Sequence, residues 1–271
     1  QNKFGDGRVF DTSLSEEGII GRAVGMALAG LLPIPEIQFR KYCDPATEQL
    51  NNCGTIRWRS NNHFAAPMVV RIPGGYRKIG DPWHSVTSEV IFAHQPGWLM
   101  AAPSNAEDAV GLLRTALRGN DPVIFFEHKS LYATKGEVPD GEIVDTLGTA
   151  RIVRPGKDAT ILALALMVPR AIEAAERLKA EHGIDCEVVD VRSLVPLDTQ
   201  TILGSVARTH RLFTVEENPR LCGWGAEIVS IVADEAFYDL DGPPVRITTP
   251  HIPLPAADIL EDIALPTVDR I

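Results

Sequence analysis

The stretch Arg8-Val-Phe-Asp-Thr-Ser-Leu-Ser-Glu16-Glu-Gly-Ile-Ile-Gly21 is followed by a run of small residues and then by Pro35-Glu-Ile-Gln-Phe39. This pattern predicts a buried strand, a turn, a helix with a carboxylate in its first turn, and a second buried strand. Such a unit would hold the Glu16 side chain at the carboxyl end of a strand, where open parallel sheets bind ligands. Glu16 is therefore the first candidate site residue. The alternative is a glutamate that only complements the helix dipole.

The composition of the chain is that of a globular protein with two domains. Its 271 residues suffice for two cores, and 45% of them are hydrophobic while 23% are charged. The formal charge of −10 argues against a surface that binds nucleic acid or anionic membranes. The four cysteines form neither a CxxC pair nor a metal-ligand spacing, which favours reduced thiols in a cytoplasmic compartment. The sequence offers no candidate transmembrane helix or signal peptide, so we expect no membrane partner.

Short apolar runs alternate with amphipathic segments, a pattern typical of parallel sheets whose strands are connected by helices. The capping sequence Ser104-Asn-Ala-Glu107 predicts the start of one helix. Periodicity is lost from about Ser130 to Asp145, where Gly, Pro and Asp accumulate, so a linker is expected there. We place this linker at 136–150, between domains at 1–135 and 151–271. The expected strands are 33–39, 68–72, 99–102 and 123–127 in the first half, and 160–167, 186–191, 212–215 and 245–247 in the second.

Two further motifs could carry chemistry. His84 follows a segment from Gly74 to Asp81 that has too many turn-forming residues for a core element. Loops of this kind often line sites, so His84 is a candidate, and the alternative is a histidine that is simply solvated. Gly5-Asp6-Gly7 is similar to the start of the Mg²⁺-diphosphate signature of thiamine enzymes. No Asn follows at the required distance, so we interpret the tripeptide as a surface turn.

Taken together and in order, the motifs of this chain resemble those of one family. This is the β subunit of the thiamine-diphosphate-dependent decarboxylating component of 2-oxo acid dehydrogenase complexes, and the match covers nearly the whole chain. The matching segments are Arg8–Gly21, Gly30–Phe39, His84-Ser85, Pro96 to Leu113, Asn120–Val123, Arg192–Asp198, Val215–Glu217, Gly223–Ile228 and Ile259–Asp262. The resemblance implies an α/β fold with a pyrimidine-binding-type thiamine domain, N-terminally short, at 1–135. It also implies a transketolase C-terminal-like α/β domain at 151–271.

The resemblance also implies roles for individual residues. Glu16 matches the glutamate that hydrogen-bonds the pyrimidine ring of thiamine diphosphate and so activates the cofactor. His84 matches the histidine near the thiazolium ring. Tyr42 matches an aromatic residue against the pyrimidine face, and Leu14 and Gln38 would line the same pocket. A carboxyl group in a dry pocket shares its proton with a ring nitrogen more readily than a solvated one.

Partners and ions are implied in the same way. A monovalent cation, K⁺, would be held largely by main-chain carbonyl groups at Met68, Ala116, Gly119 and Asp121. Because this chain lacks the Mg²⁺-diphosphate signature, the metal and the diphosphate would be held by an α subunit in an α₂β₂ heterotetramer. The implied reaction is oxidative decarboxylation of a small 2-oxo acid with acyl transfer to lipoamide. Docking to a lipoyl acyltransferase core is a further implication.

Other interpretations stay open. A transketolase-like or deoxyxylulose-phosphate-synthase-like carboligase would need basic residues for a sugar phosphate, and the neighbourhood of Arg71 and Arg77 is the candidate. A non-catalytic scaffold half is another, because the chain begins after the family's first strand and helix and stops short of its usual C-terminus. Among the dehydrogenases, Glu36-Ile-Gln-Phe39 brings the chain slightly nearer to the branched-chain than to the pyruvate type. Acetoin-cleaving enzymes are a further alternative, and Val86, which replaces the family's usual Gln, leaves the substrate and the lipoyl acceptor open.

Overall fold

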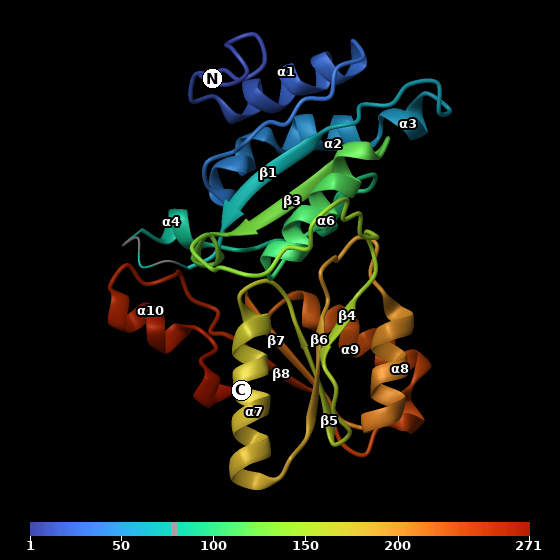
Figure 1. Ribbon diagram of the computed structural model, residues 1–271, viewed down its shortest axis with the longest axis vertical. Helices are drawn as coiled ribbons and strands as arrows, with labels where there is room; N and C mark the ends of the chain where they lie inside the picture. Colours follow the sequence, from blue (N-terminus) through green and yellow to red (C-terminus); the bar gives the residue numbers. More distant parts are fainter. Residues whose placement is uncertain (77, 79–80) are drawn as a thin grey trace.

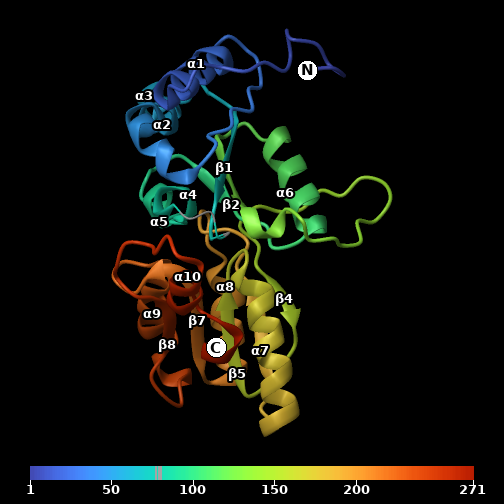
Figure 2. The ribbon, with the colours of Figure 1, turned by 90° about the vertical axis from the view of Figure 1, so that its left-hand side faces the viewer.

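The fold consists of two layered α/β units joined end to end (Figure 1). The computed structural model describes residues 1–76, 78 and 81–271. Each unit contains one sheet with helices on both faces (Figure 2). Among the described residues, no helix is both long and apolar enough to cross a membrane.

The first unit is built on a parallel three-stranded sheet in the order β1-β3-β2. Helices α1 and α2 lie on one side of this sheet and α6 on the other (Figure 2). The apolar runs of β1 and β3 fit this arrangement, because strands covered on both faces bury nearly every side chain. Asn105 caps α6 by accepting a hydrogen bond from the Asp108 amide (2.9 Å), one residue later than the capping sequence suggests. The elements are α1 (Glu16–Leu28), η1 (Arg40–Ala46), α2 (Thr47–Gly54), α3 (Ile56–Arg59), β1 (Val69–Gly74), α4 (Pro82–Ser85), α5 (Val90–Ala93), β2 (Leu99–Ala101), α6 (Ala106–Arg118), β3 (Val123–His128) and η2 (Lys129–Leu131).

The second unit contains a five-stranded sheet in the order β4-β6-β5-β7-β8, in which only β4 runs antiparallel. Side chains of β5 alternate between the two faces. Ile161 packs in the cluster that includes α7, whereas Leu162 packs in the cluster that includes α8 and α9. The elements are β4 (Arg151–Arg154), β5 (Ala159–Ala163), α7 (Met167–His182), β6 (Cys186–Asp190), α8 (Thr199–Thr209), β7 (Leu212–Pro219), α9 (Trp224–Glu235), η3 (Phe237–Asp239), β8 (Val245–Thr249), α10 (Asp258–Ala264) and η4 (Val268–Arg270).

The predicted α/β class, with parallel sheets flanked by helices, is confirmed. The buried strand expected at the start of the chain is wrong, because residues 8–14 form an exposed coil. The second expected strand is reduced to a single bridge from Glu36 to Arg71. A strand is stable only when a neighbour pairs with it, and the described residues offer no partner beside 8–14. The expected strand 160–167 ends early, at Ala163, because α7 begins at Met167.

Buried polar groups join the two units. Ser104, between β2 and α6, donates a hydrogen bond to Asp190 at the end of β6 (2.5 Å). Arg192 forms ion pairs with Asp108 (3.1 Å) and with Asp145, which lies in the predicted linker. Charged groups so deeply buried are tolerated because they are paired. These contacts fix how the end of β2 faces the end of β6.

The buried carboxyl of Asp190 predicts a pH dependence of stability. Burial raises the pKa of Asp190 to about 7, and the nearby charge of Asp108 adds to this effect while Ser104 and Arg192 oppose it. The unfolded chain therefore loses this proton at a lower pH than the folded protein, so the free energy of unfolding falls as the pH rises towards 7. We expect the free energy of unfolding of Asp190→Asn, measured by urea denaturation, to fall less between pH 5 and pH 8 than that of the wild type. Parallel curves for the two proteins would contradict this origin.

Candidate active site

Glu16 is the first residue of α1, and its carboxylate is half-buried. Within the part of the chain that the structure describes, no hydrogen bond or ion pair engages this carboxylate. Helix α1 packs against η1. Burial raises the pKa of the Cys43 thiol in η1 to about 12, and the negative charges of Asp44 and Glu16 add to this effect while Arg40 opposes it. The Glu16 carboxylate therefore lies near η1, with its oxygens available to a ligand.

An aromatic cluster surrounds His84. The imidazole stacks on the ring of Phe39, with centroids 4.0 Å apart and planes at 20°. The Tyr42 hydroxyl lies 3.0 Å from His84 Nε2, and the two rings meet edge-on. Tyr42 is in η1, and Phe39 is the residue directly before η1. The short helix η1, which lies near Glu16, therefore also orients His84. The structure thus brings three predicted residues, Glu16, Tyr42 and His84, to the short helix η1, which both α1 and α4 contact.

The backbone of His84 is held by a one-turn helix, α4. Asp81 caps this helix by accepting a hydrogen bond from the Trp83 amide (2.7 Å), and Pro82 occupies the first turn, where its missing N–H costs nothing. A second oxygen of Asp81 lies 3.9 Å from His84 Nδ1. A carboxylate at that nitrogen favours a proton on Nδ1, which leaves Nε2 to accept the hydrogen bond from the Tyr42 hydroxyl.

Lys129 was not among the residues suggested by the sequence. It begins η2, directly after β3, and only 5% of its surface is exposed. Its ammonium donates a hydrogen bond to the His84 carbonyl oxygen and lies 5.0 Å from the centre of the Phe39 ring. The one signal that could have drawn attention to it is its place at the carboxyl end of a strand, since ligands of parallel sheets bind at that edge.

Three predicted pocket residues lie at the surface. Leu14 is 86% exposed and belongs to the coil before α1. Gln38 is exposed as well, and Tyr42 is 37% exposed. No hydrogen bond among the described residues joins Leu14 or Gln38 to His84. Their roles as cofactor contacts stay predictions, and a cofactor there would need a partner chain to cover these exposed side chains.

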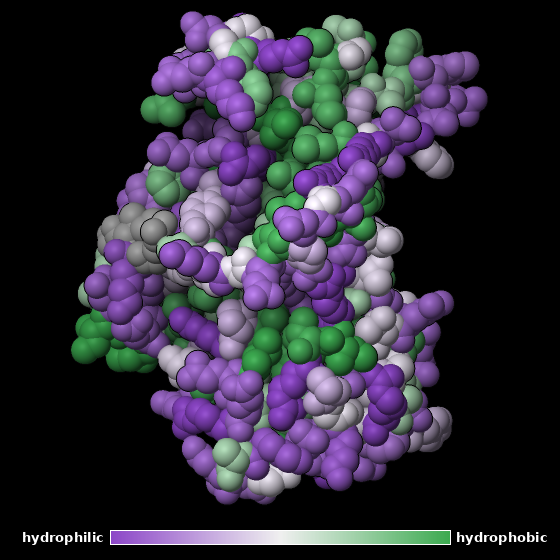
Figure 3. Space-filling model, viewed as in Figure 1, coloured by the Kyte–Doolittle hydropathy of each residue, from purple (hydrophilic) through white to green (hydrophobic). Residues whose placement is uncertain are grey.

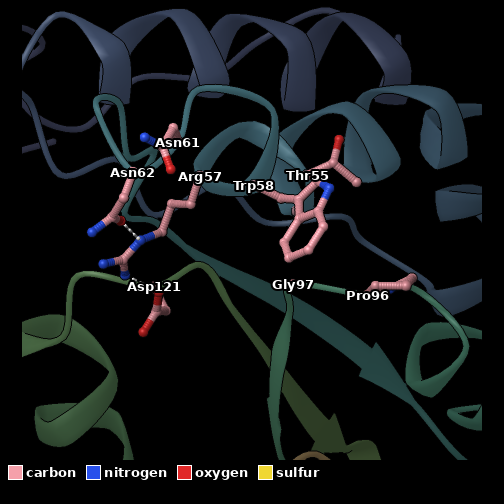
Figure 4. Close-up of a pocket in the computed structure, with 9 residues that line it drawn as sticks. Thr55, Arg57, Trp58, Asn61, Asn62, Pro96, Gly97 and Asp121 are labelled. Carbon is pink, nitrogen blue, oxygen red and sulfur yellow. Dashed lines mark hydrogen bonds and ion pairs between the residues drawn. The ribbon is translucent and has the colours of Figure 1, made fainter.

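The predicted cation ligands lie near the amino-terminal ends of β1 and β3, at the edge of the sheet opposite the carboxyl end of β3, which Lys129 follows. The Met68 carbonyl accepts a hydrogen bond from the Val123 amide (2.9 Å), and the Ala116 carbonyl accepts one from Gly119 (3.4 Å). A cleft of about 600 Å³ borders this edge and includes Asp121. Figure 4 shows the guanidinium of Arg57 between Asp121 and Asn62. Arg57 forms an ion pair with Asp121 and donates a hydrogen bond to Asn62 Oδ1 (2.8 Å).

Arg71, which the sequence offered as a candidate to bind a sugar phosphate, is already paired with two carboxylates. Arg71 donates to both carboxylate oxygens of Glu127 (2.6 and 2.8 Å) and forms an ion pair with Glu36 (2.6 Å). These two carboxylates neutralise its charge, so Arg71 offers little to an anionic ligand. Arg77, the other arginine considered, lies outside the described residues.

Comparisons with known proteins agree with this architecture. The family model of the transketolase pyrimidine binding domain matches residues 1–135, and that of the transketolase C-terminal domain matches residues 148–271. A solved structure titled as a split gene transketolase in an inactive β4 tetramer superposes with a TM-score of 0.77, covering 96% of this chain and 80% of that one. At 23% identity, that likeness shows the fold alone.

Curated relatives match over the whole chain. The 2-oxoisovalerate dehydrogenase subunit beta of Bacillus subtilis is 40% identical, over 99% of this chain and 83% of its own length. The pyruvate dehydrogenase E1 component subunit beta of Leifsonia xyli is 42% identical, over 100% and 80%. The acetoin:2,6-dichlorophenolindophenol oxidoreductase subunit beta of Bacillus subtilis is 42% identical, over 99% and 79%. The chain therefore belongs to the transketolase-fold family that includes the β subunits of 2-oxoisovalerate dehydrogenase, pyruvate dehydrogenase and the acetoin oxidoreductase.

Proposed function

We propose that this chain is the β subunit of a thiamine-diphosphate-dependent 2-oxo acid dehydrogenase that decarboxylates a small 2-oxo acid oxidatively and transfers the acyl group to lipoamide. One observation carries the proposal: in a chain of this family, a half-buried carboxylate with no partner among the described residues and a histidine oriented by aromatic rings both lie beside the short helix η1. We place the proposed pyrimidine-binding domain at 1–135, the linker at 136–150 and the C-terminal domain at 151–271.

The residues present fit the aminopyrimidine half of the cofactor. Glu16 has carboxylate oxygens without a described partner, as a group that must hydrogen-bond a ring nitrogen requires. The half-exposed ring of Tyr42 could offer an aromatic face nearby. When bound, thiamine diphosphate supplies the carbanion that adds to the carbonyl carbon of a 2-oxo acid.

The protein's own contribution would be orientation and proton handling. Glu16 would hold the pyrimidine in the tautomer that the chemistry needs, because a carboxyl group at the N-terminus of α1 is fixed by the helix. His84 would move a proton at Nε2, the nitrogen next to the Tyr42 hydroxyl. Phe39 shields one face of the imidazole and so limits its rotation.

The remaining half of the site would come from a partner. We propose an α subunit that holds Mg²⁺ and the diphosphate in an α₂β₂ assembly, because this chain lacks the diphosphate signature. Exposed apolar side chains support further association: Ile259, Leu260 and Ile263 of α10 are all more than half exposed, and Figure 3 shows an apolar area where Figure 1 draws α10. Docking to a lipoyl acyltransferase core would be one use of such a surface.

Two finer points belong to the same proposal. K⁺ would bind at the main-chain carbonyls of Met68, Ala116, Gly119 and Asp121, where the ion pair of Arg57 with Asp121 would stiffen the neighbouring loop. We place the enzyme in the cytoplasm, and its four free cysteines, of which three are buried, are consistent with a reducing compartment.

The test is co-expression of this chain with an α subunit that carries the diphosphate signature. We expect the two to co-purify, and the complex to reduce 2,6-dichlorophenolindophenol with at least one 2-oxo acid from a panel of branched-chain acids and pyruvate, only when thiamine diphosphate and Mg²⁺ are present. The relatives include both substrate types at similar identity, so the panel decides between them. A stable, fully active oligomer of this chain alone would contradict the proposed assembly.

A further inference from the structure

We propose that Lys129 is a positioning residue that fixes the orientation of His84 from behind the site. The inference deepens the proposed function and rests on it only where turnover is concerned. Neither the sequence motifs nor the names of the relatives point to this lysine. It follows from the contacts of one buried ammonium group.

The Lys129 ammonium acts on His84 in two ways, directly at its main chain and indirectly through the Phe39 ring. It donates a hydrogen bond to the carbonyl oxygen of His84, so it fixes the main chain at that residue. It also lies 5.0 Å from the centre of the Phe39 ring, and that ring stacks on the imidazole at 4.0 Å. The backbone of His84 and the surface on which its ring rests are therefore both held by the same side chain.

Lys129 can act in this way because its own backbone is anchored to the second unit. His128, the preceding residue, pairs through Nε2 with Glu217 of β7 (2.6 Å), and both side chains are buried. His128 Nδ1 accepts a hydrogen bond from the Ser130 amide (3.2 Å), which closes the turn around Lys129. Ser130 in turn donates through its hydroxyl to the Tyr76 carbonyl, at the start of the segment that leads to His84. A continuous set of contacts thus runs from Glu217 of β7 through His128 and Ser130 to Tyr76, and Lys129 lies within it.

The one-turn helix α4, which carries His84, needs such support. Helix α4 has only four residues, and a helix of one turn has no stability of its own in water. Among the described residues, the charged groups that contact His84 are Asp81, the N-cap of α4, and Lys129 of η2. Lys41 of η1 lies over the neighbouring Trp83 ring (5.0 Å). Without the ammonium, the His84 carbonyl must find water, and the imidazole is free to leave the Tyr42 hydroxyl. Such a displacement affects turnover more than substrate binding.

The experiment compares Lys129→Met, which keeps the length of the side chain but not its donors, with Lys129→Arg, which keeps a cation and donors. Lys179→Met is the matched control, because Lys179 lies half-exposed on α7 in an ion pair with Asp185, far from His84 along the chain. All are measured in the co-expressed complex. Hydrogen exchange is followed at the amides of residues 83–87, and kcat and KM are determined for the best 2-oxo acid of the panel.

For Lys129→Met we expect exchange at 83–87 to rise by about tenfold while the rest of the chain stays protected. We expect kcat to fall by about tenfold with KM changed less than about twofold. Lys129→Arg should recover most of both losses, and Lys179→Met should match the wild type.

Wild-type exchange and kcat in Lys129→Met would overturn the inference. So would equal losses in Lys129→Met and Lys129→Arg, or raised exchange throughout the chain, because either result would make the lysine a general structural residue. If the wild-type complex turns over none of the acids, the proposed function fails. The exchange measurement still decides the role of Lys129.

Discussion

Glu16→Gln in the assembled complex should lower kcat for 2-oxo acid decarboxylation by about 10²–10⁴-fold, the range typical of losing a general acid or base. Gln has nearly the same shape as Glu but cannot share a proton with the pyrimidine nitrogen. Because the Glu16 carboxylate has no described partner within the chain, the substitution should leave folding almost unchanged. Dye reduction with saturating cofactor measures kcat, and thermal unfolding checks the fold.

Glu17→Gln is the matched control, since Glu17 is the next residue in the same first turn and is exposed. Adjacent helix positions point to different faces, so Glu17 should not reach the cofactor. If both glutamates only complement the helix dipole, each substitution should cost at most about 1 kcal/mol of stability and neither should change kcat. Equal kcat values for wild type and Glu16→Gln would remove Glu16 from the proposed mechanism.

Gly97→Ala should be the most destabilising single-methyl change in the first unit, at about 3–5 kcal/mol from the sum of overpacking and backbone strain. Gly97 has φ +92°, and a Cβ atom there would overlap the carbonyl group of Gly54, the last residue of α2. Both colliding groups are backbone, so no side-chain rotation relieves the clash. The neighbouring Trp98 is buried and donates to the Leu50 carbonyl (2.8 Å), so α2 cannot move away without breaking that contact.

Gly141→Ala is the matched control that separates the cost of backbone strain from the cost of the steric overlap. Gly141 has a similar φ of +97°, but a Cβ atom there meets nothing within 4 Å. We expect it to cost only the backbone strain, about 1–2 kcal/mol. Urea denaturation of both variants gives the difference. A Gly97→Ala cost no larger than that of Gly141→Ala would show that α2 yields to the methyl group.

Local patterns predicted the parts of the fold that depend on neighbours along the chain. Continuous apolar runs indicated β3 and β6, and capping residues indicated the start of α6. They failed at residues 8–14, where an apolar-looking segment is exposed because no strand among the described residues pairs with it. They also missed β4, a short edge strand flanked by arginines, because its pairing with β6 is not visible in its own four residues.

The site divides in the same way. Glu16 could be predicted, because a carboxylate in the first turn of a helix is a local pattern, and His84 could be suggested from its loop. Lys129 could not, since its contact with His84 joins residues 45 positions apart. Asp190 meets Ser104 across 86 positions, and no periodicity records such a meeting.

The sequence by itself determined the alternation of strands and helices, the sign of the surface charge and the family, because each is set by residue type and order. The tertiary structure alone decided which polar groups meet: Tyr42 with His84, Lys129 with His84, and Ser104 with Asp190. Side-chain periodicity reports which face of an element is buried, whereas the group found opposite depends on how the crossovers place distant elements. Burial then fixes these pairs, because an unpaired polar group in the interior costs more than the order that pairing requires.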